Sequence, residues 1–126
     1  ESATRTSTGR RCASARARSV LPEAVGPMIP MIGGGTGAQY EPTVAGRGNG
    51  FLVAWTDTRN GNADIYASRV TTTGGVREPK GVAIARSAAA EFDPAAARGT
   101  QNTQLVAYTK AGGPGGPDRI KFRLVG

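Results

Sequence analysis

The sequence predicts an all-β protein built from short antiparallel strands, and three observations lead to that prediction. The chain of 126 residues contains 19 glycines and eight prolines, a composition that disfavours long helices and favours turns. From residue 27 onward, short apolar runs alternate with clusters of Gly, Asn, Asp and Pro, which is typical of strands separated by turns. The same region also contains an internal repeat.

Eight short strands are expected, with no helical segment between them. Each is a run of apolar or β-branched residues bounded by turn residues and shorter than an ordinary helix. In chain order they are residues 28–32, 43–45, 51–56, 65–71, 82–86, 94–97, 104–109 and 120–125. Asn60-Gly61, between the third and fourth of these strands, is a strong tight-turn dipeptide.

The region before these strands is expected to lie outside the core. Residues 1–26 are rich in Ser, Thr, Ala and Arg and lack the periodicity of a helix or a strand, so we expect a flexible arm. Two interpretations stay open, a solvated tail and an arm that docks on an anionic partner. The candidate docking residues are Arg5, Arg10, Arg11, Arg16 and Arg18.

The internal repeat aligns two aromatic-x-Pro motifs and the strands that follow each of them. The aligned pairs are Tyr40 with Phe92, Pro42 with Pro94, residues 52–55 with 105–108, and residues 64–70 with 119–125. The spacing between partners grows along the repeat, which places the insertions in turns, where they are tolerated.

The repeat also extends backward. Met31-Ile32 precedes the first aromatic-x-Pro motif at the distance at which Ala83-Ile84 precedes the second. We therefore expect residues 27–39 to supply the last strand of a preceding unit, residues 40–91 to form repeat 1, and residues 92–126 to form repeat 2. Repeat 1 has the four strands of an antiparallel blade, whereas repeat 2 has three and could be completed by the strand expected in residues 27–39. The chain is therefore predicted to carry two β-propeller-type repeats.

A family resemblance supports this prediction. The successive motifs P-x-V-A, F-L-V-A-W-x-D-x-R, D-I-Y-A-S-R-V, G-V and G-V-A-I-A resemble bacterial secreted tandem repeats of the myxobacterial type, within the sialidase-like and TolB-like β-propeller superfamily. The resemblance covers roughly residues 28–126 and is strongest over 40–86. The Asp-box of sialidases, S-x-D-x-G-x-T-W, does not stand in the chain. The resemblance implies a propeller and a secreted or cell-surface location, and it implies no activity.

The composition argues against an enzyme. The chain has no histidine, which removes the commonest general base and zinc ligand and excludes Ser–His–Asp and Cys–His catalysis. The carboxylates that a glycosidase would need are scattered in turns without a motif. Residues 33–37 are glycine-rich, but no G-K-[ST] follows them, so a phosphate loop is not expected. Cys12 is the single cysteine and forms no intrachain disulfide.

One candidate ligand site surrounds the expected strand that contains the single tryptophan. Trp55, Asp57, Arg59 and Tyr66 would suit a glycan, because aromatic faces stack on sugar rings while Asp and Arg bind hydroxyl or acidic groups. The alternative interpretation is that the aromatic residues pack between blades while Asp57 and Arg59 pair and hold the turn.

The same turn suggests the one cofactor that the sequence allows, calcium. Asp57, Asn60, Asn62 and Asp64 place oxygen atoms at intervals in a glycine-containing loop. The set lacks the full calcium-binding loop pattern, and Arg59 lies inside it, so a purely structural turn is the alternative.

Two blades do not close a ring, because propellers need roughly four to eight. We therefore expect a non-catalytic binding or structural module that joins other chains or copies of itself in a larger propeller. The alternatives are a fragment of a sialidase-like glycoside hydrolase or a glycan-binding lectin, and a binder of an anionic polymer through the arginine-rich arm. The formal charge of +7 favours anionic partners, but the arm lacks the interleaved aromatics of a nucleic-acid binder.

Two further expectations concern the chain as a whole. No apolar run approaches the length of a membrane-spanning helix, so no membrane span is expected. The chain begins at Glu1 rather than at methionine, so we expect either that a segment has been removed or that the chain is a piece of a longer product.

Overall fold

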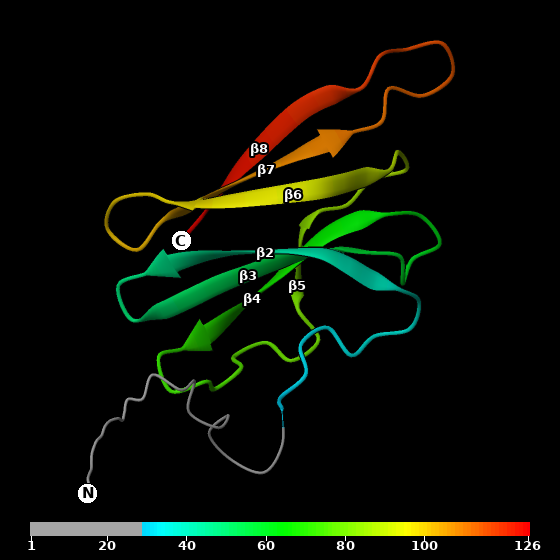
Figure 1. Ribbon diagram of the computed structural model, residues 1–126. Coiled ribbons are helices and arrows are strands. Elements are labelled where there is room, and N and C mark those ends of the chain that lie inside the picture. The colour runs from blue at the N-terminus through cyan, green and yellow to red at the C-terminus, as the bar shows by residue number, and fades with distance from the viewer. Residues whose placement is uncertain (1–28) are drawn as a thin grey trace, which may run out of the picture.

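A computed structural model describes residues 29–126, and within them all regular structure is β-strand. A first antiparallel sheet has the order β2-β3-β4-β5 and a second has the order β6-β7-β8 (Figure 1). The strands are β2 (Gln39–Arg47), β3 (Gly50–Asp57), β4 (Asp64–Thr71), β5 (Val82–Ala85), β6 (Glu91–Arg98), β7 (Gln104–Lys110) and β8 (Arg119–Val125). The all-β prediction is therefore confirmed for this part of the chain, and the expected arm at residues 1–26 lies outside it.

The expected strand at residues 28–32 is not formed where the structure describes that range. Residues 29–38 run as an irregular segment instead. The Gly33 N–H donates to the Pro79 carbonyl at 2.7 Å, which fixes the segment against the loop before β5 rather than in a sheet. The similarity of Met31-Ile32 to Ala83-Ile84 was misleading, because only the second pair lies in a strand.

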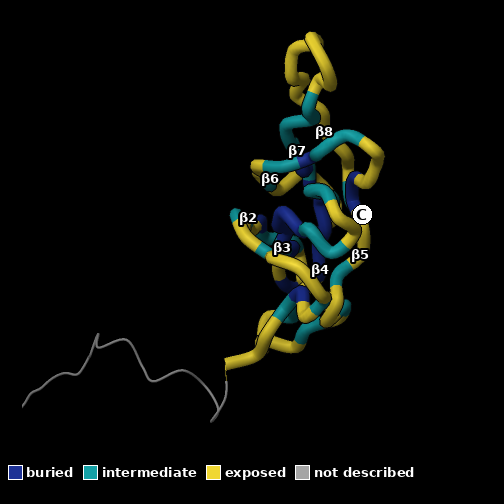
Figure 2. The backbone as a smooth tube through the Cα atoms, turned by 90° about the vertical axis from the view of Figure 1, so that its right-hand side faces the viewer, coloured by how far each residue is buried: buried dark blue, intermediate teal, exposed yellow. Residues whose placement is uncertain are grey.

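The core lies between the two sheets. Side chains alternate between the two faces of a strand, and Leu52 and Ala54 point from β3 toward the second sheet. They pack with Ile65 and Ala67 of β4 and with Val106 of β7, which is fully buried. Figure 2 shows these buried segments at the centre of the molecule and exposed loops around them.

Both sheets begin with the same irregularity. The pairing of β2 with β3 shifts between Tyr40 and Thr43, and the pairing of β6 with β7 shifts between Phe92 and Ala95. The residue inside each bulge has a φ of 56°, a left-handed conformation that is uncommon outside glycine. These two residues are Glu41 and Asp93.

The two bulges lie close enough to bond to each other. The Asp93 N–H donates to a carboxylate oxygen of Glu41 at 2.9 Å, and the Ala96 N–H donates to the Thr43 hydroxyl at 3.2 Å. The hydrogen bond with the Asp93 side chain, together with burial, raises the pKa of Glu41. Strands β2 and β6 are therefore held together by polar bonds as well as by the core.

The second sheet leaves its other face open, and the first sheet leaves part of its other face open, beside the end that Gly33 and Gly81 cover at Trp55. The first open face consists of Val44 on β2 with Phe51 and Val53 on β3, of which Val44 and Phe51 are exposed and Val53 is part-buried. The second open face consists of Leu105, Ala107, Ile120, Phe122 and Leu124, on β7 and β8. The three β8 residues of this face are among the most exposed large apolar side chains of residues 29–126.

Candidate functional site

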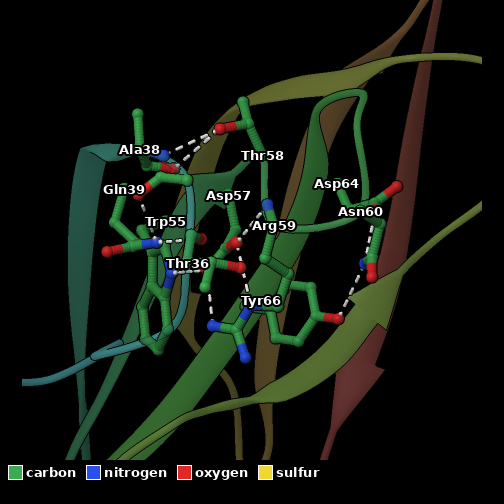
Figure 3. Close-up of polar contacts among 11 residues, drawn as sticks. Thr36, Ala38, Gln39, Trp55, Asp57, Thr58, Arg59, Asn60, Asp64 and Tyr66 are labelled. Carbon is green, nitrogen blue, oxygen red and sulfur yellow. Dashed lines mark hydrogen bonds and ion pairs between the residues drawn. The ribbon is translucent and has the colours of Figure 1, made fainter.

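The four residues predicted to form a ligand site do come together. Trp55 and Asp57 end β3, Arg59 follows in the turn, and Tyr66 lies in the adjacent strand β4. Trp55 pairs directly with Tyr66 in the sheet. The close-up in Figure 3 shows their side chains converging at this end of the sheet.

The Asp57 carboxylate organises the cluster. It accepts a hydrogen bond from Trp55 Nε1 at 2.9 Å, and one oxygen accepts from both the backbone N–H and Nε of Arg59 at 2.9 Å. Its other oxygen accepts from Arg59 Nη2 at 2.5 Å. The Arg59 guanidinium in turn lies 4.0 Å from the centre of the Tyr66 ring, within cation–π range.

The environment fixes the charge of this pair. Burial alone would raise the pKa of Asp57, but the hydrogen bonds from Arg59 and Trp55 outweigh it, so the pKa lies below the ordinary value. The hydrogen bond to Asp57 likewise raises the pKa of Arg59. Both groups are ionised at neutral pH, and both oxygens of Asp57 are occupied by residues of this chain.

A glycine-rich segment covers the cluster, a role that the sequence did not suggest. A Cβ atom on Gly33 would lie 3.1 Å from the Trp55 ring, and one on Gly35 would lie 3.0 Å from Arg59 Cζ. The segment is fastened where Ala38 donates from its N–H to the Thr58 hydroxyl at 2.8 Å. Residues 33–37 therefore act as a close-fitting cover, which explains why they are glycine-rich without forming a phosphate loop.

The cluster is consequently better suited to holding the turn than to binding a glycan. Trp55 is only 4% exposed and Asp57 is fully buried. The Asp57 carboxylate and the Arg59 guanidinium, the groups expected to bind sugar hydroxyls, bond to each other. The structural alternative, in which Asp57 and Arg59 pair, is the geometry observed.

The four residues considered for calcium do not form one ligand set. Asp57 is taken by Arg59, and Asn60 Nδ2 donates to Asp64 at 2.9 Å and to the Tyr66 hydroxyl at 3.1 Å. Asn62 Nδ2 points elsewhere, to the carbonyl oxygens of residues 87 and 88. No group of three or more acidic or Cys side chains that could hold a metal ion occurs within residues 29–126.

A different ion pair stands at the corresponding end of the second sheet. Asp57 pairs with Gln39 across β2 and β3, whereas Lys110 pairs with Glu91 across β6 and β7. Lys110 Nζ lies 2.9 Å from a carboxylate oxygen of Glu91, which is 2% exposed, and Ser87 donates to the same oxygen at 2.6 Å. The buried acid therefore lies on the second strand of the first sheet, as Asp57 of β3, but on the first strand of the second sheet, as Glu91 of β6. Its basic partner in the second sheet, Lys110, lies on the second strand, β7.

Three arginines that the sequence did not single out line a small depression of about 50 Å³. Arg47, Arg69 and Arg77 come from the ends of β2 and β4 and from the loop that follows. Arg47 donates to the Gln104 side chain at 3.0 Å, and Arg69 forms an ion pair with Glu78, whose pKa the hydrogen bond from Arg69 lowers. These three arginines are far apart in the sequence, so no local sequence pattern indicated that they would come together.

Comparisons of the chain with protein-family models, with curated proteins and with solved structures found no match. Within the part of the chain that the structure describes, no helix is long and apolar enough to cross a membrane. The five arginines of the expected arm lie outside residues 29–126, so the structure does not place them.

Proposed function

We propose that this protein is a non-catalytic structural or binding module of the cell surface or the extracellular space. In this proposal its two sheets are blades of a larger β-propeller, completed by other chains or by copies of itself. The shared bulge in β2 and β6 and the face-to-face packing of the sheets support the proposal, because propeller blades are antiparallel sheets packed in this way.

One observation carries the proposal, the second open face. Ile120, Phe122 and Leu124 are 76%, 65% and 64% exposed, side by side on one strand. A soluble chain does not usually leave such a contiguous apolar surface in water, and β8 is also a free sheet edge. Three copies would supply six blades' worth of sheets, within the range of roughly four to eight that closes a ring.

Sedimentation or light scattering of the purified chain tests this function. We expect a defined oligomer at micromolar concentration. A folded protein that stays monomeric at all concentrations would contradict it.

A second candidate function is the binding of an anionic polymer. The observation that favours it is the depression lined by Arg47, Arg69 and Arg77, together with the net charge of +7. Titration calorimetry with a sulfated polysaccharide tests it. We expect weaker binding when Arg77 is changed to Gln than when Arg86, which does not line the depression, is changed in the same way. Deletion of residues 1–19 measures how much the arm contributes to the affinity. If neither this deletion nor Arg77→Gln weakens binding, this function is excluded.

A further inference from the structure

The two sheets of this chain use different faces to contact each other. The internal alignment pairs Leu52 with Leu105 and Val53 with Val106. In the first sheet the Leu52 face is buried in the interface, whereas in the second sheet it is the Val106 face. The sheets are therefore packed head to tail, and not back to back about a two-fold axis. In such packing, the first sheet keeps a free face of the Val106 kind, and the second sheet keeps a free face of the Leu52 kind.

The second open face corresponds in sequence to the buried face of the first sheet. Ile120 and Phe122 align with Ile65 and Ala67, because Lys121 and Tyr66 occupy matching places opposite Tyr108 and Trp55. Ile65 and Ala67 are 0% exposed, whereas Ile120 and Phe122 are 76% and 65% exposed. The same positions are thus covered in one sheet and uncovered in the other.

The first open face corresponds to the face with which the second sheet enters the interface. Val53 aligns with the fully buried Val106, and its cross-strand neighbour Val44 aligns with Ala96, which also packs on the core. A hollow of about 160 Å³ borders Val53 and Trp55 on this side of the first sheet. The hollow has room for a side chain larger than alanine. Phe122 is such a side chain, and it stands on the second open face at the position that Ala67 occupies in the first sheet.

We propose that the second open face of one molecule receives the first open face of a second copy of this chain. This inference rests on the proposed function and adds the partner and the pairing of faces. Both faces are apolar and neither contains a charged residue, so the contact buries no unpaired charge. The packing of β6 and of Val106 on β7 against β3 and β4 within one molecule serves as the template for the contact between molecules.

Complementation between two variants tests the head-to-tail pairing. Val44→Glu places a charge on the first open face, and Phe122→Glu places one on the second. Each variant alone is expected to lose the assembly and remain monomeric. Their mixture is expected to form a 1:1 dimer, because the intact second face of V44E can receive the intact first face of F122E. Both substitutions introduce the same charge, so attraction between the new side chains does not account for the dimer.

The outcomes separate this inference from the function on which it rests. A wild-type chain that is monomeric contradicts the assembly itself. A wild-type chain that assembles, with either variant still self-associating or with a mixture that stays monomeric, contradicts only the pairing of faces. Far-ultraviolet circular dichroism checks that each variant is folded. Phe51→Glu and Leu124→Glu, at exposed sites on the same two faces, provide a second pair.

Discussion

The buried Asp57 carboxylate depends on partners from its own strand and turn. Trp55 and Arg59 supply all four of its hydrogen bonds, and the side chain is fully buried. A buried carboxylate without such partners would be strongly unfavourable. The pair therefore stabilises the turn between β3 and β4 only as long as both members are charged.

We expect Asp57→Asn to lower the free energy of unfolding by about 2 to 3 kcal/mol at neutral pH, because it leaves Arg59 without its counterion. The folded-state pKa of Asp57 lies below the ordinary value of 3.8, so the stabilisation is present above that value and is lost as the pH falls further. Urea unfolding of both proteins from pH 7 to pH 2 should show the difference shrinking below about pH 4.

Asp118→Asn is the control for this prediction. Its carboxylate accepts one hydrogen bond, from the Gly112 N–H, and lies at an exposed loop. A change of less than about 0.5 kcal/mol is expected there. Equal losses in the free energy of unfolding for both substitutions would show that the buried ion pair stabilises the fold no more than an exposed hydrogen bond does.

Close packing around Trp55 makes Gly81 sensitive to substitution. A Cβ atom at Gly81 would lie 2.6 Å from the indole ring, and the residue has a φ of 76°. Gly81→Ala should therefore cost about 3 kcal/mol, from the backbone strain and the steric overlap together.

Gly74→Ala isolates the backbone part of that cost. Gly74 has a φ of 91°, and a Cβ atom there would meet no atom within 4 Å. About 1 kcal/mol is expected from strain alone. Thermal unfolding of the two variants compares them, and similar losses at both sites would mean that Trp55 moves aside freely.

At the scale of the strands, equivalent positions differ in burial. Val106 of β7 is fully buried between the sheets, whereas Val53 of β3 points to the first open face. Val106→Ala should lower the free energy of unfolding by about 2 kcal/mol, through lost apolar burial and a cavity. Val53→Ala should lower it by less than about 1 kcal/mol in dilute solution. Urea unfolding at low protein concentration checks this order, and a reversed order would contradict the assignment of the faces.

The strands were the most predictable part of the fold. Apolar runs between turn residues located all seven strands of residues 29–126, and the structure extends most of them by one to four residues at an end. The alternation of Arg119, Ile120, Lys121, Phe122, Arg123 and Leu124 marked a strand with two unlike faces. The bulges were not predicted, because the left-handed residues Glu41 and Asp93 are not residues that announce such a conformation as glycine does.

The absence of the expected strand in residues 29–32 and the separation of the four calcium candidates have a common physical cause. In both cases the outcome was decided by contacts with distant residues. The irregular segment is held by Pro79, Thr58 and Trp55, and the turn residue Asn62 is engaged by carbonyls of residues 87 and 88. Local sequence patterns contain no record of such contacts, although they correctly suggested that Asp57 and Arg59 pair.

At the scale of the whole molecule, the open faces predict that folding and association are linked. A partner that binds only the folded state adds to its stability in proportion to the logarithm of partner concentration. We expect the apparent midpoint of thermal unfolding to rise over an about hundredfold increase in protein concentration. The F122E variant should show a flat dependence, and a flat dependence in the wild type would argue that its faces stay unoccupied.

The changed position of the ion pairs has a consequence for how this chain avoids misfolding. Two similar sequences in one chain invite a strand of one unit to pair with the wrong partner. If β6 took the place of β2 beside β3, Glu91 would lie opposite Asp57, and two acids would face each other in a buried site. If β2 paired with β7, Lys110 would lose its acid. The two charge arrangements thus make pairing with the first strand of the other sheet less favourable than pairing with the correct strand.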